Sequence, residues 1–333
     1  MNDLSEPAHS GRSGDLKKNV LLSLAALCVA LLFAEILVRI VDPIRPPDRV
    51  EFMVDRETYW RVIPNQADSR PPAVTVNAQG FRGVSDIGAK QSGRKRVLVL
   101  GDSYTWGMGV ADDETYAEQL QDLSRGRLEV INGGTPGWGV FQFQVRLERW
   151  IERLQPDIVV VLVNTADILR QPYASEEAEQ AFLRQSSLRN TVRRVSKLVT
   201  VTYRLIDRMK LQRDNRQVDN AVAMDQSNDV RPELYQSLLN RDIARLDEMF
   251  ELALEHGAVP VLVAWPQRVP MTESFLAAMK NFAEVREISY LDLSETLRQH
   301  DFDTYTLPND HHPSAFGNTL IAEELNRAIT ALE

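Results

Sequence analysis

The sequence predicts an α/β protein with a parallel sheet, preceded by one N-terminal transmembrane helix, and three observations lead to this prediction. Four short apolar runs rich in β-branched residues end abruptly in glycine or polar loops, as buried parallel strands do. Longer helical patterns separate the later runs and close the chain. Near the N-terminus, an almost wholly apolar stretch is long enough to cross a bilayer.

The N-terminal apolar stretch, residues 20–41, predicts a retained signal anchor that spans the membrane. Because Lys17 and Lys18 stand just before it, the positive-inside rule makes residues 1–19 a cytoplasmic tail. A cleaved signal peptide is the alternative, but the stretch is long and no clear small-x-small site follows it. We therefore expect the lipid bilayer as a partner, in a single-pass protein of the inner (plasma) membrane with a periplasmic or extracellular main domain.

The segment after the apolar stretch, residues 42–94, is punctuated by prolines. It predicts an extracytoplasmic linker that leads away from the membrane and packs loosely on the domain that follows. Residues 74–76 are a candidate edge strand within it. Residues 95–333 then form the predicted α/β domain.

The four predicted strands are apolar on both faces, which favours a sheet covered by helices on both sides. A long helical pattern at residues 232–256 precedes the last of them, and another at 315–332 ends the chain. The predicted strands are residues 97–100, Leu128–Asn132, 157–163 and 259–264.

The first predicted strand runs into Gly101, Asp102 and Ser103. A glycine after a strand lets the backbone turn sharply, and ligands of open α/β sheets bind at the carboxyl ends of the strands. Ser103 is therefore a candidate nucleophile. The alternative interpretation is that Asp102 and Ser103 form an ordinary helix N-cap.

Polar residues also follow the other predicted strands. The second strand runs into a glycine-rich loop that includes Gly137, whose backbone amides can approach a ligand closely. The third ends in Asn164-Thr165-Ala166-Asp167, and the cluster Asn309-Asp310-His311-His312 stands before the last helix. These segments place Ser, Gly, Asn and His side chains where one site can form.

With these segments in their order and spacing, the sequence resembles the SGNH (GDSL-type) hydrolase superfamily, in particular membrane-anchored bacterial members linked to polysaccharide acylation. The resemblance runs from residue 76 to the C-terminus and rests on the segments VNAQGFRG, GDSYTWGMGV, NGGTPGWGVFQ and DHHPSAFGN. It implies a three-layer α/β/α flavodoxin-like sandwich. It also implies that a serine attacks an acyl carbonyl, a glycine and an asparagine help to hold the oxyanion, and an Asp-x-x-His element supplies the base.

Carried over by position, the resemblance makes Ser103 the nucleophile and gives the backbone amides of Ser103 and Gly137 as oxyanion donors. The third segment departs from the family pattern, because Ala166 stands where the asparagine is usual. Asn164 is on the same strand face but two residues, roughly 6.6 Å, further back. Loss of one oxyanion donor typically lowers the rate about 100- to 1000-fold.

The last segment departs as well, because Asn309 stands where the family has aspartate. We favour His312 as the base with Asp310 as its helper, and His311 as base or Asn309 as the orienting group remain alternatives. Asp102, next to the serine, is a further alternative carboxylate. The two histidines could instead only cap the last helix.

An insertion at about residues 171–231 separates the third strand from the long helical pattern. Residues 184–216 hold ten Lys/Arg and two acids, with apolar residues at three- and four-residue steps. This pattern predicts an amphipathic helix with a basic face. The helix either packs on the core or covers the Ser103 edge and contacts anionic polysaccharide or membrane headgroups.

Composition excludes several classes of protein. The net charge of -9 argues against a nucleic-acid partner, and the single cysteine, Cys28, rules out an internal disulfide and a cysteine-based metal site. Gly107 and Gly109 lack the remaining features of a dinucleotide fingerprint. We expect no cofactor and no metal.

Together these observations predict a membrane-anchored serine esterase or O-acyltransferase that acts on acyl esters, most simply acetyl esters, of a cell-surface or exported polysaccharide. The substrate partner would be an acylated carbohydrate. For a transferase, the resemblance adds a membrane-bound partner that exports the acyl group. The alternative, motivated by Ala166 and Asn309, is a catalytically degenerate protein that binds glycans or assembly partners.

Overall fold

The structure is a computed structural model that describes residues 12–41, 50–69, 71–169, 232–267, 271–308 and 310–332. The described residues belong to two units, an N-terminal helix and an α/β domain, and each is described by itself. The predicted basic insertion at residues 171–231 lies outside the described residues.

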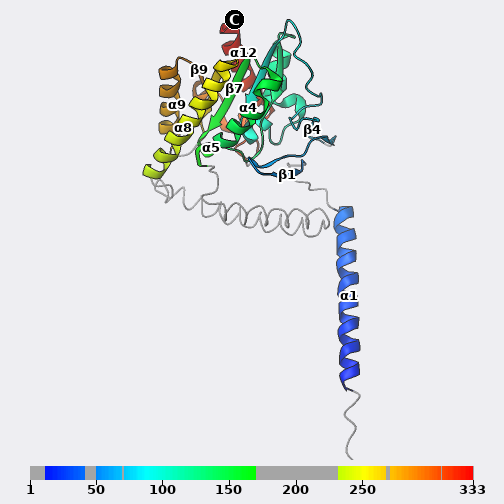
Figure 1. The fold of residues 1–333 in the computed structure, drawn as a ribbon. Helices are drawn as coiled ribbons and strands as arrows, with labels where there is room; N and C mark the ends of the chain where they lie inside the picture. The colour runs from blue at the N-terminus through cyan, green and yellow to red at the C-terminus, as the bar shows by residue number, and fades with distance from the viewer. Residues whose placement is uncertain are drawn as a thin grey trace, which may run out of the picture. The chain divides into compact units, whose positions relative to one another are not determined.

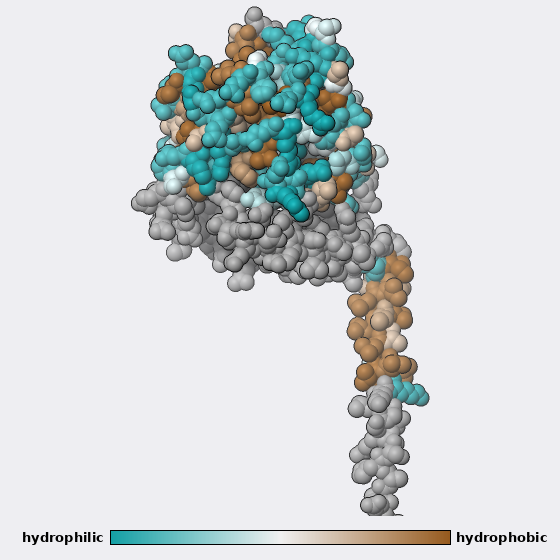
Figure 2. All heavy atoms as spheres, viewed as in Figure 1, coloured by the Kyte–Doolittle hydropathy of each residue, from teal (hydrophilic) through white to brown (hydrophobic). Residues whose placement is uncertain are grey.

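The N-terminal helix, α1, spans Arg12–Val41. Its stretch Lys18–Leu37 is long and apolar enough to cross a membrane, and none of it is buried against other residues. Its surface is accordingly almost wholly hydrophobic (Figure 2), whereas the visible face of the α/β domain is mainly hydrophilic. At 1.5 Å per residue, 20 helical residues extend about 30 Å, the thickness of a hydrocarbon core.

The α/β domain is built on a five-stranded, wholly parallel sheet with the order β6-β5-β7-β8-β9. This is the flavodoxin-like order, which confirms the predicted fold class. The strands are β5 (Lys95–Leu100), β6 (Leu128–Asn132), β7 (Ile158–Asn164), β8 (Val259–Trp265) and β9 (Ser289–Asp292). The first four were predicted to within two residues at each end, and β9 was not predicted.

Helices cover both faces of the sheet and so make three layers (Figure 1). On one face lie α4 (Val140–Leu154), α8 (Pro232–Glu255) and α9 (Thr272–Arg286). On the other lie α3 (Tyr116–Leu123) and α12 (Ala315–Ala331). The helices predicted at residues 232–256 and 315–332 are therefore confirmed.

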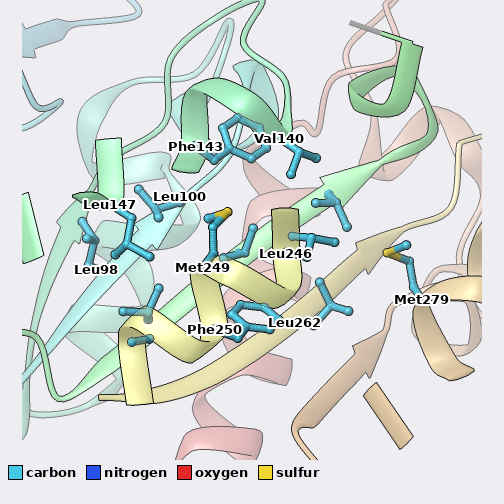
Figure 3. Packing of buried hydrophobic residues seen from close by; sticks show 14 of the residues in the cluster. Leu98, Leu100, Val140, Phe143, Leu147, Leu246, Met249, Phe250, Leu262 and Met279 are labelled. Carbon is cyan, nitrogen blue, oxygen red and sulfur yellow. The ribbon is translucent and has the colours of Figure 1, made fainter. Parts of the chain in front are cut away.

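Alternation along the strands divides the core into two halves. Leu98 and Leu100 of β5 point toward α4 and α8, and Val97 and Val99 point toward α3 and α12. Figure 3 shows the first half, where leucine, phenylalanine and methionine side chains interdigitate between sheet and helices. All seven residues of β7 are buried, because this central strand has helices on both faces.

Residues 50–87 pack on the α/β domain much more closely than the predicted loose linker, so that expectation is wrong. They form two antiparallel strand pairs, and the strands are β1 (Phe52–Asp55), β2 (Tyr59–Val62), β3 (Gln66–Asp68) and β4 (Val74–Val76). The Nε1–H of Trp60 donates to the Pro136 carbonyl (3.1 Å), and Arg82 is buried with hydrogen bonds to three backbone carbonyls. The Trp60 contact fixes this segment beside the glycine-rich loop, and the Arg82 contacts fix it to residues 106–110.

Short helices occupy the remaining connections. They are α2 (Ser103–Trp106), η1 (Asp112–Glu114), α5 (Thr165–Leu169), α10 (Ser294–Arg298) and α11 (Phe302–Tyr305). Two of them, α2 and α5, begin directly at the carboxyl ends of β5 and β7, where the candidate site lies.

Candidate active site

Ser103 stands at the first position of α2, three residues beyond the end of β5. The turn between them requires Gly101, because a Cβ there would collide with the Thr105 side chain and lie 3.0 Å from the Leu162 carbonyl oxygen. The helix is capped by Asp102, whose side chain accepts from the Tyr104 N–H (2.8 Å). The cap is therefore Asp102, and the Ser103 hydroxyl is left for other partners.

Those partners come from the other end of the chain. His312 Nε2 lies 2.8 Å from Ser103 Oγ, across 209 residues of sequence. The other ring nitrogen, Nδ1, lies 2.5 Å from Asp310 Oδ1, which also accepts from the His312 backbone N–H (3.1 Å). The hydrogen bond from His312 lowers the pKa of the Asp310 carboxyl, so this group is a carboxylate at neutral pH. Hydroxyl, imidazole and carboxylate thus form one chain.

The loop before α12 holds His312 in this position. A backbone hydrogen bond joins the Leu307 N–H to the His312 carbonyl (2.9 Å), and Ser314 caps α12 by accepting from the Gly317 N–H (3.2 Å). The imidazole packs against the buried Tyr104 ring, with centroids 5.0 Å apart. The cap of α12 is therefore Ser314, and the His312 side chain contacts Ser103 and Asp310 instead of capping the helix.

The alternative residues of this segment take other places. The His311 side chain is exposed, and its ring lies against Phe302, with centroids 5.8 Å apart. Asn309 lies outside the described residues. Of the histidine pair, the structure brings His312, with Asp310, to Ser103.

The predicted oxyanion donors are the backbone N–H groups of Ser103 and Gly137. Gly137 has a φ of 81°, and a Cβ there would lie 3.2 Å from the Trp60 ring, so a glycine is required. The loop is fixed beside β5, because the Thr135 N–H donates to the Gly101 carbonyl (3.1 Å). Within the described ranges, the N–H groups of Ser103 and Gly137 donate no hydrogen bond to the protein.

The third predicted donor, Asn164, is fully buried at the end of β7 and is engaged within the protein. Its Nδ2 lies 3.2 Å from Asp102 Oδ2, and its Oδ1 accepts from the Ala166 N–H (2.9 Å). The same Asp102 oxygen lies 3.3 Å from Ser103 Oγ. Asn164 therefore supports the group beside the nucleophile, and a role as an oxyanion donor stays a prediction.

One residue of the site, Gln267, was missed by the sequence analysis. Its Oε1 accepts from the Ala166 N–H (3.0 Å), and its Nε2 donates to the Tyr104 hydroxyl (3.2 Å). Burial raises the pKa of Tyr104, so this phenol stays protonated at neutral pH. The missed signal was position, since Gln267 stands two residues after β8 at the same edge of the sheet as Ser103.

This arrangement suits nucleophilic acyl transfer, because an imidazole contacts the hydroxyl and a carboxylate orients the imidazole. Among the described residues, no cluster of three or more His, Cys, Asp or Glu side chains could hold a metal ion.

Comparison with known proteins gives a family match. The model of the GDSL-like lipase/acylhydrolase family matches residues 99–320, a span that includes Ser103, Asp310 and His312. No curated protein matches the chain.

Several solved structures are similar to the α/β domain. They include the esterase EstA from Pseudoalteromonas sp. (13% identity, 72% of this chain and 98% of that chain, TM-score 0.45). They also include a GDSL-like lipase from Bacteroides thetaiotaomicron (14%, 74% and 93%, TM-score 0.45). A third is the acetylxylan esterase Axe2 from Geobacillus stearothermophilus (16%, 71% and 94%, TM-score 0.42).

Proposed function

Because the chain belongs to the GDSL-like lipase/acylhydrolase family, we propose that it is a serine esterase or O-acyltransferase that forms an acyl-enzyme on Ser103. The observation that carries the proposal is the continuous contact from Ser103 Oγ through the imidazole of His312 to the Asp310 carboxylate.

In the proposed reaction, Ser103 Oγ attacks the carbonyl carbon of an ester while His312 Nε2 accepts its proton. Asp310 keeps the ring in the tautomer that leaves Nε2 unprotonated and then stabilises the imidazolium. The N–H groups of Ser103 and Gly137 stabilise the oxyanion of the tetrahedral intermediate. The imidazolium returns its proton to the leaving alkoxide, and an acyl ester remains on Ser103.

The second half of the reaction decides between hydrolysis and transfer. If water attacks the acyl-enzyme, the protein is an esterase; if a sugar hydroxyl attacks it, the protein is an O-acyltransferase. In both cases His312 removes a proton from the attacking hydroxyl. For a transferase, a partner in the membrane would have to supply the acyl group on the outer side.

We further propose that α1 anchors the protein and that the α/β domain acts outside the cytoplasm on acyl esters of a surface or exported glycan. The apolar length of α1 supports the anchor, and the lysines before it support this orientation. A reporter fused after Val41 tests the orientation, because we expect alkaline phosphatase to be active there. A fusion active only in the cytoplasm contradicts it.

A second candidate function, glycan binding without catalysis, is favoured by one observation. Ala166 has no side-chain donor, and the amide of Asn164 is turned toward Asp102 instead. A site with fewer oxyanion donors would turn over slowly or not at all.

Turnover of p-nitrophenyl acetate by the full chain in detergent separates the two functions. We expect slow release of p-nitrophenol that is lost in Ser103→Ala and His312→Ala and retained in the matched control His311→Ala. Release that is the same in wild type and Ser103→Ala would leave only the binding function.

A further inference from the structure

A cavity of about 370 Å³ lies between α4 and the segment that contains β1 and β2, apart from the candidate active site residues Ser103 and His312. Its lining is unusually basic, with four guanidinium groups against the single carboxylate of Asp55. The arginines are Arg61, Arg146, Arg149 and Arg153. The last three stand at positions i, i+3 and i+7 of α4 and so project from one side of the helix. Since the whole chain carries a net charge of -9, this concentration of positive charge is local.

Arg146 is the most informative member, because its side chain is buried, with only 6% of the residue exposed, and still lines the cavity. One hydrogen bond, from Nη1 to the Gly133 carbonyl (3.0 Å), is its polar contact. Its guanidinium also lies over the Trp138 and Phe81 rings, 4.5 and 4.8 Å from their centroids. In the part of the chain that the structure describes, no carboxylate forms an ion pair with Arg146.

The neighbouring charges make this burial costly. Burial, together with repulsion from Arg149 and Arg61, lowers the pKa of Arg146 to about 9, so the group is still charged at neutral pH. Asp55 lies 2.7 Å from Arg149 and 3.4 Å from Arg61, and Glu57 lies 2.6 Å from Arg149, so both carboxylates are engaged by arginines other than Arg146. A buried cation without its own carboxylate is destabilising unless an anion from outside the chain completes the site.

Arg153 adds a second cation without a carboxylate partner among the described residues. It is exposed and lies 5.6 Å from the centroid of the Trp150 ring, which also lines the cavity. Planar guanidinium groups bind carboxylate and phosphate oxygens in a bidentate manner, and an aromatic wall suits the apolar face of a sugar. The lining therefore fits an anionic group that is attached to a larger polar molecule.

The cavity is joined to the candidate active site by the glycine-rich loop. Trp138, which lines the cavity, directly follows Gly137, and Arg146 binds the carbonyl of Gly133 in the same loop. The indole of Trp138 donates to the Trp60 carbonyl (3.0 Å), and Trp60 is the residue beside Gly137. A ligand in the cavity would thus contact the structure that presents the candidate oxyanion donor.

We infer that this arginine-lined cavity binds a carboxylate group carried by the glycan substrate, so that the substrate is an acidic polysaccharide. This inference rests on the proposed function, because the glycan is the substrate proposed for Ser103. Charge recognition beside the glycine-rich loop would hold the polymer while an ester on a neighbouring sugar reaches the serine.

Binding measurements on the full chain in detergent at low salt test this inference. The probes are oligogalacturonate as a carboxylate-bearing glycan, a xylo-oligosaccharide as a neutral glycan, and sodium phosphate as a free anion. We expect calorimetry to detect oligogalacturonate, with at least 10-fold weaker binding of the neutral glycan and of phosphate. Arg153→Gln, on the exposed rim, should weaken oligogalacturonate at least 5-fold, and Arg146→Gln should weaken it more.

The matched control is Arg298→Gln, which removes the same charge from an exposed position on α10. Because Arg153 is exposed, its variant stays informative even where Arg146→Gln does not fold. Absence of oligogalacturonate binding, equal weakening by Arg298→Gln, or equal binding of the neutral glycan would overturn the inference. Tight phosphate binding without glycan binding would also overturn it, since the cavity would then be a site for small free anions.

The same binding assay on Ser103→Ala separates this inference from the proposed function. Binding that persists in Ser103→Ala, in a chain without serine-dependent turnover of p-nitrophenyl acetate, would contradict the esterase and leave the anion site standing. Serine-dependent turnover without oligogalacturonate binding would support the esterase and overturn the anion site.

Discussion

The carboxyl ends of β5 and β7 lie side by side at one edge of the sheet, yet they are equipped very differently. Beyond β5, the Ser103 hydroxyl meets an imidazole at 2.8 Å, and that imidazole is held by a carboxylate. At the end of β7, Asn164 turns its amide toward Asp102, and Ala166, two residues further on, has no side-chain donor. The side chains proposed to transfer the proton are in contact with one another, whereas the end of β7 offers no side-chain donor for an oxyanion from Asn164 or Ala166.

Acyl transfer requires proton transfer and stabilisation of the oxyanion, and in the proposed reaction separate segments of the chain would supply these two requirements. The proposed proton path depends on the loop before α12, and the proposed oxyanion donors depend on the loops after β5 and β6. A chain can therefore retain the proton path and lose some of the oxyanion donors. We expect an enzyme whose rate is limited by stabilisation of the oxyanion.

The largest expected effect comes from Ser103→Ala, which removes the nucleophile at the β5 end. We expect esterase turnover to fall by about 10,000-fold without loss of the fold. Turnover of p-nitrophenyl acetate and a circular dichroism spectrum measure the two. A smaller loss with intact protein would mean that the hydrolysis occurs elsewhere.

Asp310→Asn should have the next largest effect, because an amide cannot stabilise the imidazolium as the carboxylate does. We expect kcat to fall roughly 100- to 1000-fold, since the Asp310 side chain is partly exposed and water screens part of its charge. The KM should change little. If Asp310→Asn retains wild-type kcat, the orienting group is another residue of the segment.

Asn164→Ala tests the β7 end through stability. The side chain is fully buried and bonds to Asp102 and to the start of α5, so its removal deletes these buried hydrogen bonds and leaves a cavity. We expect the free energy of unfolding to fall by about 2 kcal/mol in urea titrations. A neutral effect on stability combined with a large loss of kcat would instead identify Asn164 as an oxyanion donor.

Ala166→Asn should have the smallest effect of the four variants, and it should raise kcat where the others lower activity or stability. An amide at position 166 would add a side-chain donor at the β7 end, and we expect kcat to rise about 10-fold. Thr165→Asn is a matched control one residue away on the chain. An unchanged kcat in Ala166→Asn would mean that an amide at position 166 does not reach the oxyanion.

Most of the fold could be predicted because its signals are local. Strands buried on both faces are continuous apolar runs, and four of the five were found for that reason. The short β9 lies at the sheet edge with partly exposed side chains, so it lacks such a run. The close packing of residues 50–87 depends on Trp60 and Arg82 meeting distant carbonyls, which no local pattern reveals.

The site divides in the same way. Ser103 and His312 stand in ordered motifs, and the choice of Asp310 over Asn309 could be reasoned from carboxylate chemistry. The engagement of Asn164 by Asp102 and the contact of Gln267 with Tyr104 are tertiary and needed coordinates. Arg146 was invisible for another reason, because an arginine on an amphipathic helix is normally solvent-exposed.

Peptide mass spectrometry after treatment with a fluorophosphonate ester tests the central claim most directly, because this reagent phosphonylates only activated serines. We expect one adduct, on the peptide that contains Ser103, whose formation slows at least 100-fold in His312→Ala. An unmodified Ser103 in folded wild-type protein, or equal labelling with and without His312, would contradict the account.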